Sequence, residues 1–103
     1  MRAANPLRGE VALPEACGAR LLRPTFGALV AAEGELGSLL GVLERAGAGE
    51  VRLADMAALF WHCLAEREGL ERADFEERLV ACGIAVLLPC FRALLGGVFG
   101  TRA

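Results

Sequence analysis

The apolar segment from Leu79 to Gly100 constrains the fold of this chain more than any other part, because Arg92 is its only charge. A helix over 84–99 would carry leucine, valine and phenylalanine side chains around nearly its whole circumference. Such a helix has to be buried, and a chain of 103 residues has few other elements to cover it. Either the remaining helices wrap it, or part of it meets a partner; the sequence leaves both open.

This segment does not have the pattern of a membrane span. The uncharged run from Leu79 to Phe91 is shorter than the ~20 residues that a transmembrane helix needs. Arg92 would add about 2.5–3.5 kcal/mol at the centre of a span. Pro89 costs about 3 kcal/mol inside a helix, so we expect the last helix to start nearer Leu87 or to bend. A buried helix is the prediction, with no membrane partner.

The remaining pattern predicts an α+β fold in one domain, 1–103: a short N-terminal β-hairpin followed by a bundle of four to five α-helices. Residues 1–7 are expected to form a flexible arm, 8–24 the hairpin and 25–100 the helical part. The strand candidates are 9–13 and 19–23, separated by Pro14 and a turn ending in Gly18. An isolated hairpin is marginally stable, so it should lie on the helices or join another sheet edge.

The helices are predicted from apolar spacing and capping residues. Thr25 is an N-cap candidate for 25–46, which is either one kinked helix or two, with Ser38 as a second cap. Amphipathic spacing predicts further helices over 54–67 and 72–82. The inner face of the first helix is assigned to Phe26, Leu29, Val30 and Leu36, and the glycines at 47–49 and 96–97 are interpreted as helix breakers.

Charge and cysteine content narrow the class of protein. The net charge is −2, and the basic residues, all arginine, are scattered singly, which disfavours nucleic-acid binding. The four cysteines, Cys17, Cys63, Cys82 and Cys90, have no metal-ligand spacing and are expected to be reduced thiols. With no apolar segment near Met1 that would serve as a signal peptide, the sequence predicts a cytoplasmic protein.

Catalytic patterns are weak. His62 and Cys63 are neighbours, but adjacent helical residues point about 100° apart, so the imidazole would not reach the thiol. The acidic residues between Glu66 and Glu77 alternate with arginines, as is typical of a solvated helix face. The sequence therefore predicts a protein that is not an enzyme, with no catalytic, cofactor-binding or metal-binding residues.

Two segments resemble a known family. Arg8-Gly9-Glu10-Val11-Ala12-Leu13 and Arg23-Pro24-Thr25-Phe26-Gly27-Ala28-Leu29 are similar to the start of small proteins encoded beside the major tail protein in gene transfer agents and siphophage-like prophages. These proteins are grouped with phage tail assembly chaperones. Pro14 and Cys17 depart from the pattern, which suggests a shorter hairpin.

The resemblance implies a role in tail morphogenesis: a chaperone that holds the tape measure protein soluble until tail tube subunits polymerise around it. The major tail protein is a second candidate partner, and a homo-oligomer is left open. The alternatives are a structural, tube-associated tail subunit and a small cytoplasmic adaptor or regulator. We expect the partner-binding surface on the outer part of the last helix and near it, at Phe60, Trp61, Leu87, Phe91 and Leu95.

Overall fold

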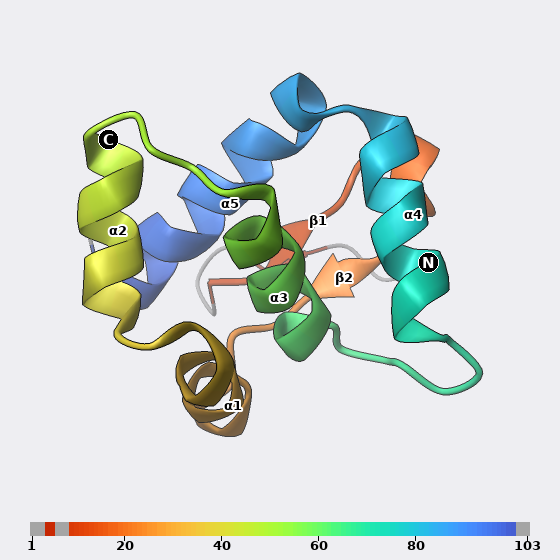
Figure 1. Ribbon diagram of the computed structural model, residues 1–103. Coiled ribbons are helices and arrows are strands. Elements are labelled where there is room, and N and C mark those ends of the chain that lie inside the picture. The colour runs from red at the N-terminus through yellow and green to blue at the C-terminus, as the bar shows by residue number, and fades with distance from the viewer. Residues whose placement is uncertain (1–3, 6–8, 101–103) are drawn as a thin grey trace.

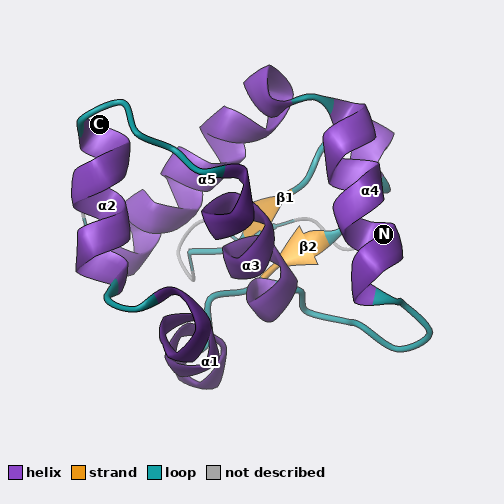
Figure 2. Ribbon diagram, viewed as in Figure 1, coloured by secondary structure: helices purple, strands orange, loops and turns teal. Residues whose placement is uncertain are grey.

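The computed structural model describes residues 4–5 and 9–100 and confirms the predicted α+β fold (Figures 1 and 2). Most of the predicted flexible arm, at 1–3 and 6–7, lies outside the described residues, as does Arg8. The elements in chain order are β1 (Val11–Ala12), the short 3-10 helix η2 (Glu15–Cys17), β2 (Leu21–Leu22), α1 (Phe26–Leu36), α2 (Leu39–Gly47), α3 (Leu53–Cys63), α4 (Arg72–Cys82) and α5 (Ile84–Phe99).

The hairpin is shorter than predicted and is completed by a third segment. β1 and β2 pair antiparallel, with Val11 opposite Leu22. On its other edge, Leu22 forms an isolated bridge with Leu64, just after α3. The Arg23 amide donates to the Cys63 carbonyl at 2.6 Å, which extends this pairing. The hairpin therefore joins another edge, as its marginal intrinsic stability requires.

The predicted caps divide 25–46 into two helices. The Thr25 hydroxyl accepts a hydrogen bond from the Ala28 amide at 3.1 Å, and the Ser38 hydroxyl accepts one from the Gly41 amide at 3.2 Å. Gly37 separates the helices with φ +82°, a conformation that favours glycine. The axes of α1 and α2 differ by 72°.

The inner face of α1 is only partly the predicted one. Phe26 is 84% exposed and Val30 is also exposed, whereas Ala32 is fully buried and Leu29 and Leu36 are half-buried. The assignment of Phe26 and Val30 to the core was therefore wrong. The small Ala32 side chain allows α1 to lie close against the centre of the molecule, and this rotates the two larger side chains outward.

The central element is α3, around which the other helices and the hairpin are arranged (Figure 1). Every residue from Asp55 to Phe60 is buried, and Asp55 is paired through Oδ2 with Arg45 Nη2 of α2 at 3.0 Å. α3 ends at Cys63, before the predicted end at Arg67, because the chain leaves the helix to pair with β2. The most enclosed helix is thus α3 rather than α5.

α5 buries one stripe and continues through its proline. Leu87, Phe91, Leu94 and Leu95 face the core at i, i+4, i+7 and i+8. The helix begins at Ile84 rather than near Leu87, and Pro89 lies inside it on the exposed side. Gly97 also lies inside α5, where an added Cβ would come 3.3 Å from Gly9 Cα. The glycine pair 96–97 therefore permits close packing and does not break the helix.

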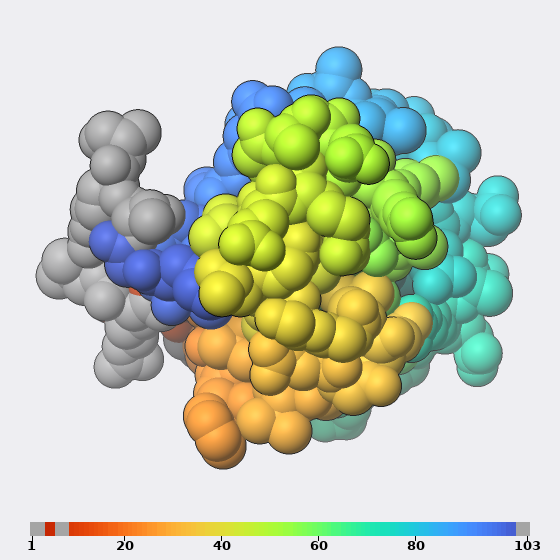
Figure 3. Space-filling model, turned by 60° about the vertical axis from the view of Figure 1, so that its left-hand side comes forward, coloured from red at the N-terminus to blue at the C-terminus, as the bar shows by residue number. Residues whose placement is uncertain are grey.

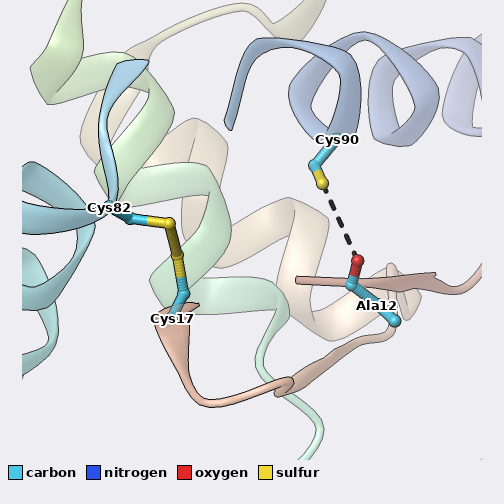
Figure 4. Close-up of a disulfide and its surroundings, with 4 residues drawn as sticks. All are labelled: Ala12, Cys17, Cys82 and Cys90. Atoms are coloured by element: carbon cyan, nitrogen blue, oxygen red, sulfur yellow. Dashed lines mark hydrogen bonds between the residues drawn. A yellow bond between two sulfur atoms is a disulfide. The ribbon is translucent and has the colours of Figure 1, made fainter. Parts of the chain in front are cut away.

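The expectation of four reduced thiols differs from the structure, in which Cys17 and Cys82 form a disulfide (Figure 4). The bridge ties η2, next to the hairpin, to the last residue of α4, with a Cα–Cα distance of 5.9 Å. The free cysteines are Cys63, which is buried, and Cys90, whose thiol donates to the Ala12 carbonyl at 3.7 Å. Sequence spacing gave no sign of this pair because the two residues are 65 positions apart.

Candidate functional site

Four of the five residues predicted to bind a partner lie in the hydrophobic core. Phe60 and Leu87 are 0% exposed, and Phe91 and Leu95 are equally enclosed. The Phe60 and Phe91 rings pack edge to face, with centroids 6.2 Å apart. In the folded monomer Phe60, Leu87 and Phe91 offer almost no surface to a partner, whereas Leu95 contributes to the lining of a groove described below. The other elements wrap this face of α5, which was the alternative that the sequence left open.

Trp61, the fifth residue, lies at the edge of the core. Its ring is half-buried and packs against Phe75 of α4, with centroids 5.9 Å apart. The Arg67 guanidinium lies over the same ring, 5.4 Å from its centroid. The indole thus has two intramolecular neighbours, and its contact with Phe75 joins α3 to α4.

His62 and Cys63 do not act on each other. The His62 Nε2 atom lies 2.8 Å from Glu35 Oε1, and Arg72 binds the same carboxylate with two nitrogens, at 3.0 and 2.5 Å. Hydrogen bonds from Arg72 and then His62 lower the pKa of Glu35 to about 2. Burial raises the pKa of the Cys63 thiol to about 12, so it stays protonated at neutral pH. This cluster holds α1, α3 and α4 together.

Exposed apolar side chains occur at two main places among the described residues. One is α1, where Phe26 and Val30 lie one turn apart on the same face. The other is the corner between α4 and α5, where Val80, Ile84 and Val86 are each about half exposed. The predicted apolar outer surface of the last helix thus exists, but at its first turn and with different residues.

A groove lies between α2 and α5, which adjoin each other in both views (Figures 1 and 3). Its volume is about 180 Å³, and we call it the α2–α5 groove. The lining is mainly apolar, and three of its residues, Ala46, Gly47 and Gly96, are small. The full set of lining residues is Leu43, Ala46, Gly47, Arg92, Leu95 and Gly96. Leu95 thus lines the floor of a hollow although its own surface is covered.

The exposed Leu40 lies on the same face of α2 as two of the groove residues. Leu40, Leu43 and Gly47 follow each other at i, i+3 and i+7, so they share one face of the helix. Arg92 contributes the charge at the α5 side. The sequence contained this signal as small residues at helical spacing, but glycine there was interpreted as a breaker.

The described residues, 4–5 and 9–100, contain neither a cluster of metal ligands nor a single helix with the length and apolarity of a membrane span. No group of three or more histidine, cysteine, aspartate or glutamate residues is placed to hold a metal ion there. No single helix within residues 9–100 is long and apolar enough to cross a membrane. Two bent pairs, α1 with α2 and α4 with α5, reach the required length and composition only when each pair is taken together.

Comparison with known proteins gives one family. A search of curated proteins and a search of solved structures found no match. The family model described as "Phage tail tube protein, GTA-gp10" matches residues 8–101, nearly the whole chain and both of the segments that carry the resemblance. The chain therefore belongs to the GTA-gp10 family of gene transfer agent and phage tail proteins.

Proposed function

We propose that this protein is a non-enzymatic tail assembly chaperone, which binds the tape measure protein in the cytoplasm of the bacterial host until the tail tube forms. The observation that carries the proposal is the α2–α5 groove. An apolar groove between two helices is the usual receptor for the apolar face of an amphipathic partner helix. A tape measure protein is a long helical rod, and its apolar stripe needs cover before assembly.

The size of the groove fits one anchoring side chain. A cavity of about 150 Å³ lined by apolar side chains binds benzene. The α2–α5 groove, at about 180 Å³, is therefore large enough for one leucine or phenylalanine of a partner helix. Ala46, Gly47 and Gly96 let the partner backbone approach closely. Arg92 would pair with an acidic residue one turn away from that anchor.

The test fills the groove without disturbing the fold. A Cβ added at Gly47 meets no atom within 4 Å, so Gly47→Phe places a ring in the groove at little cost to the monomer. Gly34→Phe is the matched control, because Gly34 also lies in a helix with open space around it, and it does not line the groove. Each variant is co-expressed with the tape measure protein of the same tail system, and the co-purified and soluble fractions are measured.

We expect Gly47→Phe to abolish co-purification and solubilisation, while Gly34→Phe behaves as the parent protein. Equal binding by the two variants would refute the groove as the binding site. Loss of binding by both would point to a general effect on the protein, which circular dichroism and thermal unfolding would detect. The same co-expression with the major tail protein in place of the tape measure protein tests the second candidate partner.

A structural tail subunit is the second candidate, and the description of the matching family as a tail tube protein favours it. The two functions differ in whether the protein is present in the finished tail. A structural subunit stays in the finished tail in a fixed ratio to the other tail proteins, whereas a chaperone is released. Quantitative mass spectrometry of purified particles separates them: near-stoichiometric amounts would overturn the chaperone proposal.

A further inference from the structure

A second hollow, away from the α2–α5 groove, has a cationic lining. It lies where β2 ends, α1 begins and α3 ends, and its volume is about 230 Å³. Arg23, His62 and Arg67 supply its charged and polar side chains, and Thr25, Gly27 and Ala28 supply the first turn of α1. No acidic residue is among the described residues that line it. We call it the cationic pocket.

The walls of the cationic pocket are fixed by backbone hydrogen bonds. The Arg23 amide donates to the Cys63 carbonyl at 2.6 Å, and the Ala65 amide donates to the Leu21 carbonyl at 3.0 Å. The Thr25 cap fixes the first turn of α1, which follows β2 after three residues. Because three elements are locked together here, the geometry exists before any ligand arrives, which reduces the ordering cost of binding.

The three charged and polar side chains of the pocket differ in how far they are already paired within the protein. Arg23 Nε pairs with the buried Glu10 carboxylate at 2.8 Å, and its Nη2 atom is buried with no hydrogen-bond partner among the described residues. Arg67 stacks on Trp61, and no carboxylate of the described residues pairs with it. His62 is bound to Glu35. Arg67 is therefore the cation most available to an anionic ligand, and the first-turn amides of α1 would support it.

The size and rim of the pocket indicate what kind of anion it takes. Ligand pockets for drug-sized molecules usually exceed about 300 Å³. At about 230 Å³ this one suits a single acidic side chain better. Phe26 lies between the lining residues Thr25 and Gly27 in the chain and is 84% exposed. An exposed phenylalanine next to a cationic hollow is complementary to a protein segment that carries an acidic and an apolar residue side by side.

We propose that the cationic pocket binds one glutamate or aspartate side chain of a protein partner, whose neighbouring apolar side chain packs on Phe26. Arg67 would donate to the carboxylate, and the first turn of α1 would close the site. This site is separate from the α2–α5 groove, so either can fail alone: Gly47→Phe leaves the cationic pocket intact, and substitutions at Arg67 leave the groove intact.

The test uses blocked peptides as probes. The amide resonances of Gly27, Ala28 and Ala65 are followed by NMR during titration with acetyl-Leu-Glu-Leu-amide, with acetyl-Leu-Gln-Leu-amide, and with inorganic phosphate. We expect the glutamate peptide to shift these resonances and the glutamine peptide to bind about tenfold more weakly, the loss that one hydrogen bond to a charged group produces. Phosphate should bind more weakly than the glutamate peptide, because it has no apolar contact with Phe26.

Two variants localise the effect. Arg67→Gln should lower the affinity for the glutamate peptide about tenfold. Arg52→Gln, at an exposed arginine that does not line the pocket, should leave its affinity unchanged. Equal affinity for the two peptides, or shifts that do not involve the pocket, would overturn the proposal without any variant. Phosphate binding as tight as the glutamate peptide would show a general anion site and refute the recognition of a protein side chain.

Discussion

Reduction of the Cys17–Cys82 disulfide should destabilise this protein by a large fraction of its total stability. The bridge closes a loop with a sequence separation of 65. The chain-entropy relation for a cross-link of this length gives about 4 kcal/mol at 25 °C. Small domains have a free energy of unfolding of about 5–15 kcal/mol. The oxidised and reduced proteins should therefore differ by about 15–30 °C in melting temperature, at about 4–8 °C per kcal/mol.

The assay compares urea unfolding of the oxidised protein with that of the protein kept in dithiothreitol, followed by circular dichroism. Cys17→Ala combined with Cys82→Ala should match the reduced protein and lose its response to dithiothreitol. Cys90→Ser is the matched control: this cysteine is free, so the variant should keep the full response. Thiol titration in urea should find two reactive thiols in the oxidised protein, from Cys63 and Cys90.

A difference below about 1 kcal/mol between the oxidised and reduced proteins would refute this reasoning, since it would mean that the bridge leaves the unfolded chain nearly unconstrained. Four thiols in the air-oxidised protein would refute the pairing itself. The result also bears on the proposed location. The cytoplasm keeps thiols reduced, so a chaperone acting there would work in the less stable form.

Other predictions follow from single side chains. Phe91→Ala should cost about 3–5 kcal/mol in urea unfolding because the ring is buried against Phe60, whereas Phe26→Ser should change stability by less than about 0.5 kcal/mol. The pKa of Glu35 is lowered from 4.5 to about 2, so its ionised carboxylate stabilises the fold fully above pH 4.5, and this stabilisation is lost as pH falls towards 2. Because the carboxylate is over a third exposed, we expect it to contribute about 1 kcal/mol to the free energy of unfolding. The Glu35→Gln variant should lack this contribution. Gly83→Ala should cost about 1 kcal/mol or more because φ is +100° there, and a thermal melt that does not move would contradict this.

The sequence predicted those parts of the fold that depend on local chemistry. The caps Thr25 and Ser38, the bounds of α4 and the end of α5 follow from capping residues, glycine and apolar spacing within a few positions. Because of Pro89, we expected α5 to start nearer Leu87 or to bend. A proline on the solvent side costs less than one in the core, because water can bind the carbonyl that the absent proline N–H leaves unpaired. Local reasoning thus fails where the cost of a residue depends on which side of the helix it occupies.

Features that depend on contacts between distant residues could not be predicted. The bridge between Leu22 and Leu64 ends α3 early, and no residue near Cys63 in the sequence predicts this helix end. The disulfide and the cluster of Glu35, His62 and Arg72 likewise join residues far apart in the chain. The α2–α5 groove is space that the side chains of two neighbouring helices leave unfilled. It exists because small side chains face each other across these helices, which periodicity alone does not reveal.

The burial of α5 also explains why the predicted binding residues and the observed surfaces differ. A sequence-based search for a binding surface selects the largest apolar side chains, but in so small a domain these are the ones that the core needs first. Leu87, Phe91 and Leu95 are used in this way, leaving for partners the shallow groove beside Leu95 and the side chains at element ends. Small grooves bind weakly one at a time, and a partner that must later be released needs weak contacts. On a long helical partner whose apolar stripe repeats along its length, each copy of a chaperone built on this fold would therefore bind and leave independently.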